Sequence, residues 1–173
     1  MSRNVLLQLL GGTKGSPALR RWISLWPPFL GAGISRETHR GDMKAVEIEM
    51  KLRFWKANYV GAHFGGPLFV MTDPFYMLMV MANLGRTHIV WDKAASIRYR
   101  KPGRGVVRAD FRLTDAQLDD IREKLNTLPN YEPVFSVDVK DEQGNVIAEV
   151  EKVLHVRKKP EVAASGPSSR GTE

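Results

Sequence analysis

The stretch PLFVMTDPFYMLMVMAN, residues 67–83, has apolar side chains on every side when it is wound into a helix. A helix on the surface of a domain keeps a polar face toward water, whereas a helix buried all round does not. From Phe64 to Leu84 the only charged residue is Asp73. The sequence therefore predicts a central helix that the other elements of the domain surround.

Strands are predicted on both sides of this helix. Residues 44–54 alternate strictly between apolar and charged side chains, as a half-buried strand does. Four strand-like segments follow the helix, at about His88–Arg100, Val106–Leu113, Val134–Val139 and Val146–Val156. An antiparallel sheet that buries one face around a central helix satisfies both patterns, so the predicted class is α+β.

Two local features lie among the later strands. Thr114–Leu125 is amphipathic and begins with a good N-cap residue, which predicts a short helix between strands. In the last strand the alternation changes phase at Glu151-Lys152, which predicts a β-bulge there.

The chain of 173 residues, 43% of them apolar, fits one domain with flanking segments. We assign 1–42 to an N-terminal helical extension with a helix at Ser16–Trp26, 43–159 to the α+β domain and 160–173 to a disordered tail. The apolar stretch 29–34 leaves three roles open: covering a core edge, lining an acyl pocket or touching a membrane.

Composition excludes several kinds of site. Without cysteine there is no disulfide, no thiolate catalysis and no zinc site with sulfur ligands, which fits a cytoplasmic protein. The four histidines lack metal-ligand spacing, so we predict no metal. Phe64–Leu84 has the length of a membrane span, but it would place Asp73 near the bilayer centre, so no transmembrane segment is predicted.

The net charge of +7 is unevenly distributed. Residues 86–108 hold seven Lys/Arg and one Asp, whereas residues 109–151 hold four Lys/Arg and eleven Asp/Glu. Such a basic patch attracts the phosphates of nucleic acid, anionic lipid or coenzyme A, although an ordinary solvated strand face has the same composition. Because the patch lacks interleaved aromatic residues that stack on bases, we predict no nucleic-acid partner.

Asp73 also stands at the end of a spaced motif. Asn58, Gly61, Gly65-Gly66 and Asp73 have the spacing of an Asn, a Gly three residues later, a His-Gly-Gly, and an acid seven positions after the second Gly. In this motif and in element order over about 43–159, the chain resembles the phenylacetate-pathway type of acyl-CoA thioesterase, within a branch often described only as a domain of unknown function. Phe64 occupies the place of the motif histidine, and His63 lies one residue early.

The resemblance implies the hotdog fold, a curved antiparallel sheet around a long central helix, and a catalytic set of Asp73, Asn58 and Gly66. Asp73, supplied across a dimer interface, would activate water or attack the thioester, and burial would raise its pKa toward the working pH. The Gly66 N–H would stabilise the oxyanion and Asn58 would orient the carbonyl or the water. Two alternatives remain open: Asp73 as the N-cap of a helix that starts at Pro74, and Asn58 as a cap of its own turn.

Substrate-binding residues are expected at the glycine turn and in the basic patch. They are Gly65, His63 and Phe64 at the turn, and Arg98, Arg100, Lys101 and Arg104 for the phosphates of coenzyme A. The expected partners are an acyl-CoA or related acyl ligand and further copies of the chain, as a dimer or dimer of dimers. No cofactor is expected beyond the coenzyme A of the substrate. Because the motif histidine is missing, a non-catalytic acyl- or lipid-binding hotdog protein is the alternative.

Overall fold

The structure is a computed structural model that describes residues 27–39 and 42–160. Six strands form one sheet in the order β1-β2-β4-β5-β6-β3, and each neighbouring pair is antiparallel. The strands are β1 (Ile34–His39), β2 (Ala45–Lys51), β3 (His88–Tyr99), β4 (Val106–Arg112), β5 (Val134–Asp141) and β6 (Val146–Lys158). The helices are α3 (Pro27–Ala32), the 3₁₀ turn η1 (Phe54–Lys56), α4 (Gly65–Val70), α5 (Phe75–Leu84) and α6 (Asp115–Thr127). The expected helix at 16–26 and the tail from residue 161 lie outside the described residues.

The apolar run that predicts one central helix forms two helices, α4 and α5. Pro74 is the N-cap of α5, where its missing N–H costs no hydrogen bond. By length and composition alone Gly65–Leu84 could cross a membrane, but more than half of that run is buried inside the domain. This is the pattern of a core helix.

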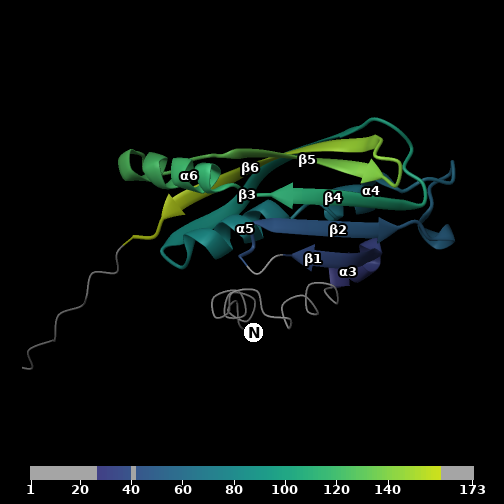
Figure 1. The fold of residues 1–173 in the computed structure, drawn as a ribbon, viewed down its shortest axis with the longest axis horizontal. Helices are drawn as coiled ribbons and strands as arrows, with labels where there is room; N and C mark the ends of the chain where they lie inside the picture. The colour runs from purple at the N-terminus through teal and green to yellow at the C-terminus, as the bar shows by residue number, and fades with distance from the viewer. Residues whose placement is uncertain (1–26, 40–41, 161–173) are drawn as a thin grey trace, which may run out of the picture.

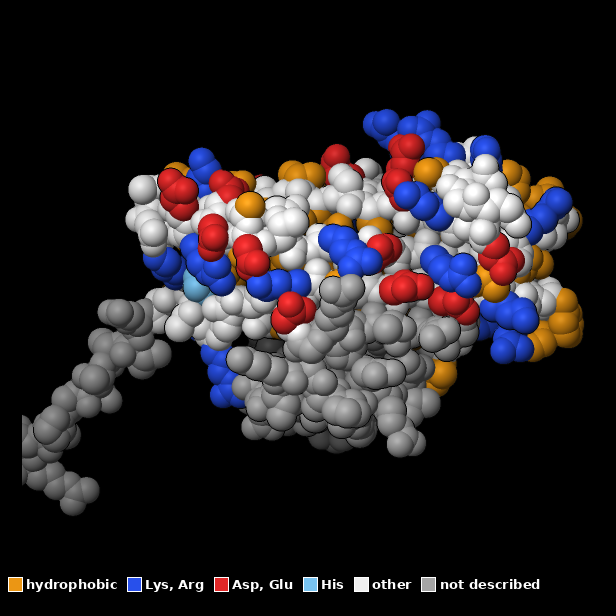
Figure 2. Space-filling view, viewed as in Figure 1, with side chains coloured by type: hydrophobic (Ala, Val, Ile, Leu, Met, Phe, Trp, Pro, Cys, Tyr) orange, Lys and Arg blue, Asp and Glu red, His pale blue; other side chains and the backbone are white. Residues whose placement is uncertain are grey.

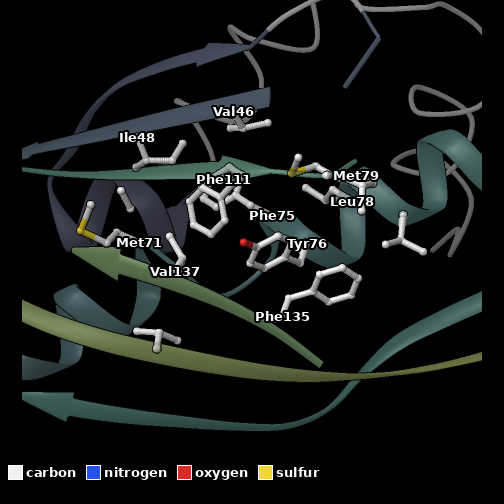
Figure 3. Packing of buried hydrophobic residues seen from close by; sticks show 14 of the residues in the cluster. Val46, Ile48, Met71, Phe75, Tyr76, Leu78, Met79, Phe111, Phe135 and Val137 are labelled. Atoms are coloured by element: carbon white, nitrogen blue, oxygen red, sulfur yellow. The ribbon is translucent and has the colours of Figure 1, made fainter. Parts of the chain in front are cut away.

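Helix α5 supplies the centre of the core, as Figure 3 shows. The rings of Phe75 and Phe111 lie 5.1 Å apart, and Tyr76 stacks on Phe135 at 4.6 Å between ring centroids. Ile48 of β2 is also buried in this cluster. The predicted arrangement, an antiparallel sheet packed around a buried helix, is confirmed.

Residues 27–39 do more than extend the chain. Phe29, Ala32 and Ile34 are buried in the core, and β1 pairs with β2 as an edge strand of the sheet. Figure 1 shows α3 and β1 side by side next to β2. We assigned this segment to a helical extension because ISRETH, residues 34–39, has no apolar alternation. Of the three roles left open for 29–34, covering the core edge is the one observed.

The bulge predicted at Glu151-Lys152 of β6 is not found there. Inward-facing residues of β6 keep their alternation without a break: Ala148, Val150, Lys152, Leu154 and Val156 are all buried. One register shift lies on the neighbouring strand β3, between Asp92 and Ala94. A second lies nearer the start of β6, where Val139 of β5 pairs with Ala148 and Lys140 pairs with Val146. Lys152 interrupts the apolar pattern of the sequence although its side chain faces inward, which gives the appearance of a change of phase.

Helix α6 matches its prediction closely. Thr114 caps it through a complete capping box with Gln117, and Leu118, Ile121 and Leu125 face the core.

Candidate functional site

Asp73 lies in the turn between α4 and α5, with its side chain about half exposed (51%). No side chain caps α5, so the N-cap alternative is not what the structure shows. Instead, Asp73 Oδ1 accepts a hydrogen bond of 2.9 Å from Lys152 Nζ of β6. The burial that the resemblance implies for Asp73 is therefore missing in the single chain.

Lys152 is almost completely buried, with 1% of its side chain exposed, and it contacts a second carboxylate. Its Nζ forms an ion pair of 2.9 Å with Asp92 Oδ1 of β3. Burial raises the pKa of Asp92, the Lys152 ammonium opposes that shift, and the negative charge of Asp73 adds to it. A buried cation thus stands between two carboxylates.

Lys152 is the residue that sequence reasoning missed. The signal was present, since Lys152 is in phase with Ala148, Val150, Leu154 and Val156 along one strand. A lysine on the apolar side of an alternating strand requires a buried partner.

Asn58 holds its own turn together. Its Oδ1 accepts hydrogen bonds from the N–H groups of Val60 (3.1 Å) and Ala62 (3.0 Å), and its Nδ2 donates to the His63 carbonyl at 3.4 Å. Gly61, in the same turn, has a φ of +69°, a conformation that favours glycine. The alternative role for Asn58, capping its own turn, is the one observed in the single chain.

The glycine pair opens α4, and the two residues differ in their surroundings. The Tyr99 hydroxyl donates a hydrogen bond to the Gly65 carbonyl at 3.1 Å, and a Cβ on Gly65 would lie 2.7 Å from that hydroxyl oxygen. Gly66 has more room, with the Phe64 ring 3.4 Å from the position of a Cβ. Neither glycine has a positive φ, so backbone conformation does not require glycine at either position. What distinguishes Gly65 from Gly66 is the lack of space for a side chain.

The two residues at the motif-histidine position point in different directions. His63 is buried, and its Nε2 lies 3.1 Å from the Gly105 carbonyl oxygen. Burial lowers the pKa of His63, and the contact with that carbonyl opposes the shift. Phe64 is the N-cap residue of α4 and is 60% exposed. The imidazole is therefore turned toward the 103–105 loop, and an exposed apolar ring takes its place.

The basic loop lies against this turn. His63 N donates to the Gly103 carbonyl at 2.9 Å, and the Arg104 guanidinium donates to the Val60 carbonyl at 3.2 Å. Of the candidates for binding phosphate, Arg104 is thus the one that contacts the 58–62 turn, which precedes the glycine pair.

The other phosphate candidates have different surroundings. Arg100 forms an ion pair of 2.6 Å with Glu149, which neutralises its charge, and Lys101 Nζ lies 3.4 Å from Asn145 Oδ1. Arg98 is exposed on β3. Within residues 27–39 and 42–160, neither Arg98 nor Lys101 forms an ion pair.

The predicted residues therefore form two clusters within one chain. One is the loop cluster around Asn58, the glycine pair and Arg104, and the other is Asp73 with Lys152 and Asp92. No contact within the described part of the chain joins Asp73 to Asn58 or Gly66. The same residues contain no group of three or more His, Asp or Glu side chains that could hold a metal ion.

An open cleft of about 1050 Å³ lies elsewhere, between β4 and β5. These strands pair only from Val107 to Ala109, and beyond that point the Tyr76 hydroxyl bridges the gap by donating to the Ser136 carbonyl at 2.7 Å. Figure 2 shows acidic and basic side chains mixed over this side of the sheet. None of the predicted site residues lines the cleft, so we do not assign the motif chemistry to it.

Solved structures share this fold at low sequence identity. A protein of unknown function from Pseudomonas aeruginosa, described as a probable thioesterase, is 20% identical, with a TM-score of 0.69 over 86% of this chain and 100% of its own. A thioesterase from Haemophilus influenzae is 15% identical, with a TM-score of 0.57 over 84% of this chain and 92% of its own. A protein of unknown function from Chlorobaculum tepidum is 12% identical, with a TM-score of 0.65 over 84% of this chain and 99% of its own.

These structural similarities show that the chain has the hotdog fold. No curated protein matches the chain. A family model described as "Domain of unknown function (DUF4442)" matches residues 15–156, which is most of the sequence. The chain therefore belongs to the DUF4442 family.

Proposed function

We propose that this protein is a thioesterase-like hydrolase that cleaves acyl-CoA, with Asp73 as its catalytic base. The observation that carries the proposal is the Asp73 carboxylate itself. It stands at the motif spacing from the glycine pair, half exposed, and its own helix does not use it as a cap. The hotdog fold, shared with structures described as thioesterases, supports the reaction class by analogy.

The proposed reaction is direct hydrolysis of the thioester. Asp73 removes a proton from water as the water oxygen attacks the acyl carbonyl, and the C–S bond then breaks. The proton held by Asp73 passes to the departing coenzyme A thiolate. The Gly66 N–H, which has no hydrogen-bond partner among the described residues, would stabilise the negative carbonyl oxygen.

A second copy of the chain completes the site in this proposal. Asp73 and Gly66 make no contact with each other in one chain, and β3 stands at the end of the sheet with one edge free of strand pairing in the described residues. Residues 93–96 of that edge strand are exposed. Pairing of β3 with its symmetry mate would cover the edge and bring the Asp73 of one subunit toward the loop cluster of the other, in a dimer or a dimer of dimers.

The coenzyme A phosphates are assigned to Arg104, Lys101 and Arg98, which form no ion pair within the described ranges. Arg104 has the strongest claim because its contact with Val60 places it beside the glycine motif. Arg100 contributes less because Glu149 already balances its charge.

The test is release of free thiol from a panel of acyl-CoA substrates of increasing chain length. Wild-type protein should release thiol from at least one of them. Loss of the base in Asp73→Asn should slow release by roughly 100-fold or more. Asp119→Asn, on the exposed surface of α6, is the matched control and should keep wild-type turnover. Absence of thiol release from every substrate would reject the proposal.

One observation favours a second candidate, a non-catalytic acyl-binding protein. The motif histidine is replaced by Phe64, and the neighbouring His63 is turned toward the 103–105 loop. That function predicts a rise in the melting temperature when an acyl-CoA is added, without any release of thiol.

A further inference from the structure

Lys152 occupies a position that normally holds an apolar residue. It faces inward on β6 between Val150 and Leu154, and 1% of its side chain is exposed. Removing an ammonium from water is costly unless ionic partners and hydrogen bonds replace the lost solvation. A neutral side chain would fill the same space without that cost, so the charge itself needs a reason.

The strand next to β6 is shaped to accommodate this charge. At the register shift in β3, Asp92 pairs with Leu154, and after the shift Ala95 pairs with Lys152. The extra β3 residue leaves Asp92 in contact with the lysine, and the small Ala95, which is exposed in the single chain, is paired opposite Lys152. Asp92 then lies 2.9 Å from the ammonium, which holds the cation at a fixed place in the domain.

The third member of the group comes from another element. Asp73, in the α4–α5 turn, accepts a hydrogen bond from Lys152 through Oδ1, while its Oδ2 has no such contact among the described residues. One oxygen of the carboxylate is therefore anchored and the other is left for water. In space the three side chains lie in the order Asp92, Lys152, Asp73, from the partly buried carboxylate to the more exposed one.

We propose that Lys152 and Asp92 are positioning residues for Asp73. Lys152 fixes one carboxylate oxygen, so that the second faces the attacking water, and Asp92 holds the Lys152 ammonium in place. This inference rests on the proposed function, because it assigns roles around the same carboxylate. A purely structural pair that ties β6 to β3 would stabilise the domain equally well without affecting the reaction.

The test compares three variants with the wild type on a substrate that the wild type hydrolyses. Lys152→Met keeps an unbranched side chain in the core but removes the charge, and Asp92→Asn removes the partner carboxylate. The double variant, Lys152→Met with Asp92→Asn, leaves no unpaired buried charge, so it should recover the stability that the Lys152→Met variant loses. Lys140→Met, which removes an exposed lysine paired with Asp138 of β5, is the matched control.

Misplacement of Asp73 should reduce kcat about 10- to 100-fold in Lys152→Met and in the double variant, with KM changed less than about threefold. Asp92→Asn should reduce kcat by less, because the Lys152 cation remains. Lys152 and Asp92 are the charged groups that lie against Asp73 from β6 and β3.

The outcomes separate this inference from the proposed function. If the double variant regains both stability and wild-type kcat, the pair is structural and the inference is wrong, although hydrolysis stands. If Lys152→Met is folded and turns over like the wild type, the inference is also wrong. If the wild type hydrolyses no acyl-CoA, the proposed function fails and this role fails with it.

Discussion

The Tyr99 side chain occupies the space that a side chain at position 65 would need, and Gly65 has none. A Cβ there would lie 2.7 Å from the Tyr99 hydroxyl oxygen, whereas a Cβ on Gly66 would meet the Phe64 ring at an ordinary 3.4 Å. We expect Gly65→Ala to lower the free energy of unfolding by about 1–2 kcal/mol, because the Tyr99 side chain must move and lose its hydrogen bond. Gly66→Ala should change it by less than about 0.5 kcal/mol or raise it, since alanine favours helix. Urea denaturation measures both values.

A double-mutant cycle identifies the cause. In a Tyr99→Ala background the destabilisation by Gly65→Ala should disappear, because the clashing group is gone. An undiminished loss in that background would show that Gly65 is required for another reason.

Asn58 has a stabilising role that is separable from catalysis. Its Oδ1 accepts two backbone hydrogen bonds in the 58–62 turn, so Asn58→Ala should lower the free energy of unfolding by about 1–2 kcal/mol. Asn58→Asp keeps an acceptor oxygen at that position and should lose less. Thermal melts of the two variants test this order, and equal losses would mean that the Nδ2 group holds the turn.

At the scale of elements, Tyr76 of α5 joins two strands that have separated. Its hydroxyl donates to the Ser136 carbonyl of β5, and burial raises the pKa of Tyr76 to about 12, an effect that a hydrogen bond to the Arg112 backbone opposes. The unfolded chain, with a tyrosine pKa of about 10, therefore releases this proton first as pH rises. The stability that Tyr76 contributes is present below about pH 10 and is lost as pH rises through about 12.

The variant Tyr76→Phe isolates that contribution. At neutral pH it should cost about 1 kcal/mol for the lost hydrogen bond. Between about pH 9 and about pH 11 the wild type should lose roughly 1.4 kcal/mol more than Tyr76→Phe. Tyr59→Phe, at a fully exposed position, should follow the wild type. Parallel pH dependence in all three proteins would contradict the assignment.

Elements with strong periodicity were predictable from sequence, and elements that depend on tertiary contacts were not. Helix α6 and strand β2 follow from spacing and capping. Strand β1 did not, because its polar residues form a strand only by pairing with β2. In the candidate site, too, only one of the two central residues could be predicted from the sequence. Asp73 stood out as an isolated charge, but Lys152 was hidden because outward-facing is the usual place for lysine.

At the scale of the whole molecule, two features predict self-association: the edge of β3, which pairs with no other strand of the described residues, and the separation of Asp73 from the loop cluster. Light scattering coupled to size-exclusion chromatography should give at least twice the 19.5 kDa mass of one chain. A monomer at concentrations where the protein hydrolyses acyl-CoA would reject the shared site.

Hydrolysis that depends on the Asp73 carboxylate is the central claim for the whole protein. It is tested most directly by the rate of thiol release from an acyl-CoA substrate, measured side by side for the wild type and Asp73→Asn at equal melting temperature. We predict turnover by the wild type and a loss of roughly 100-fold or more in the variant. Equal turnover by the two proteins would contradict the assignment of Asp73 as the catalytic base.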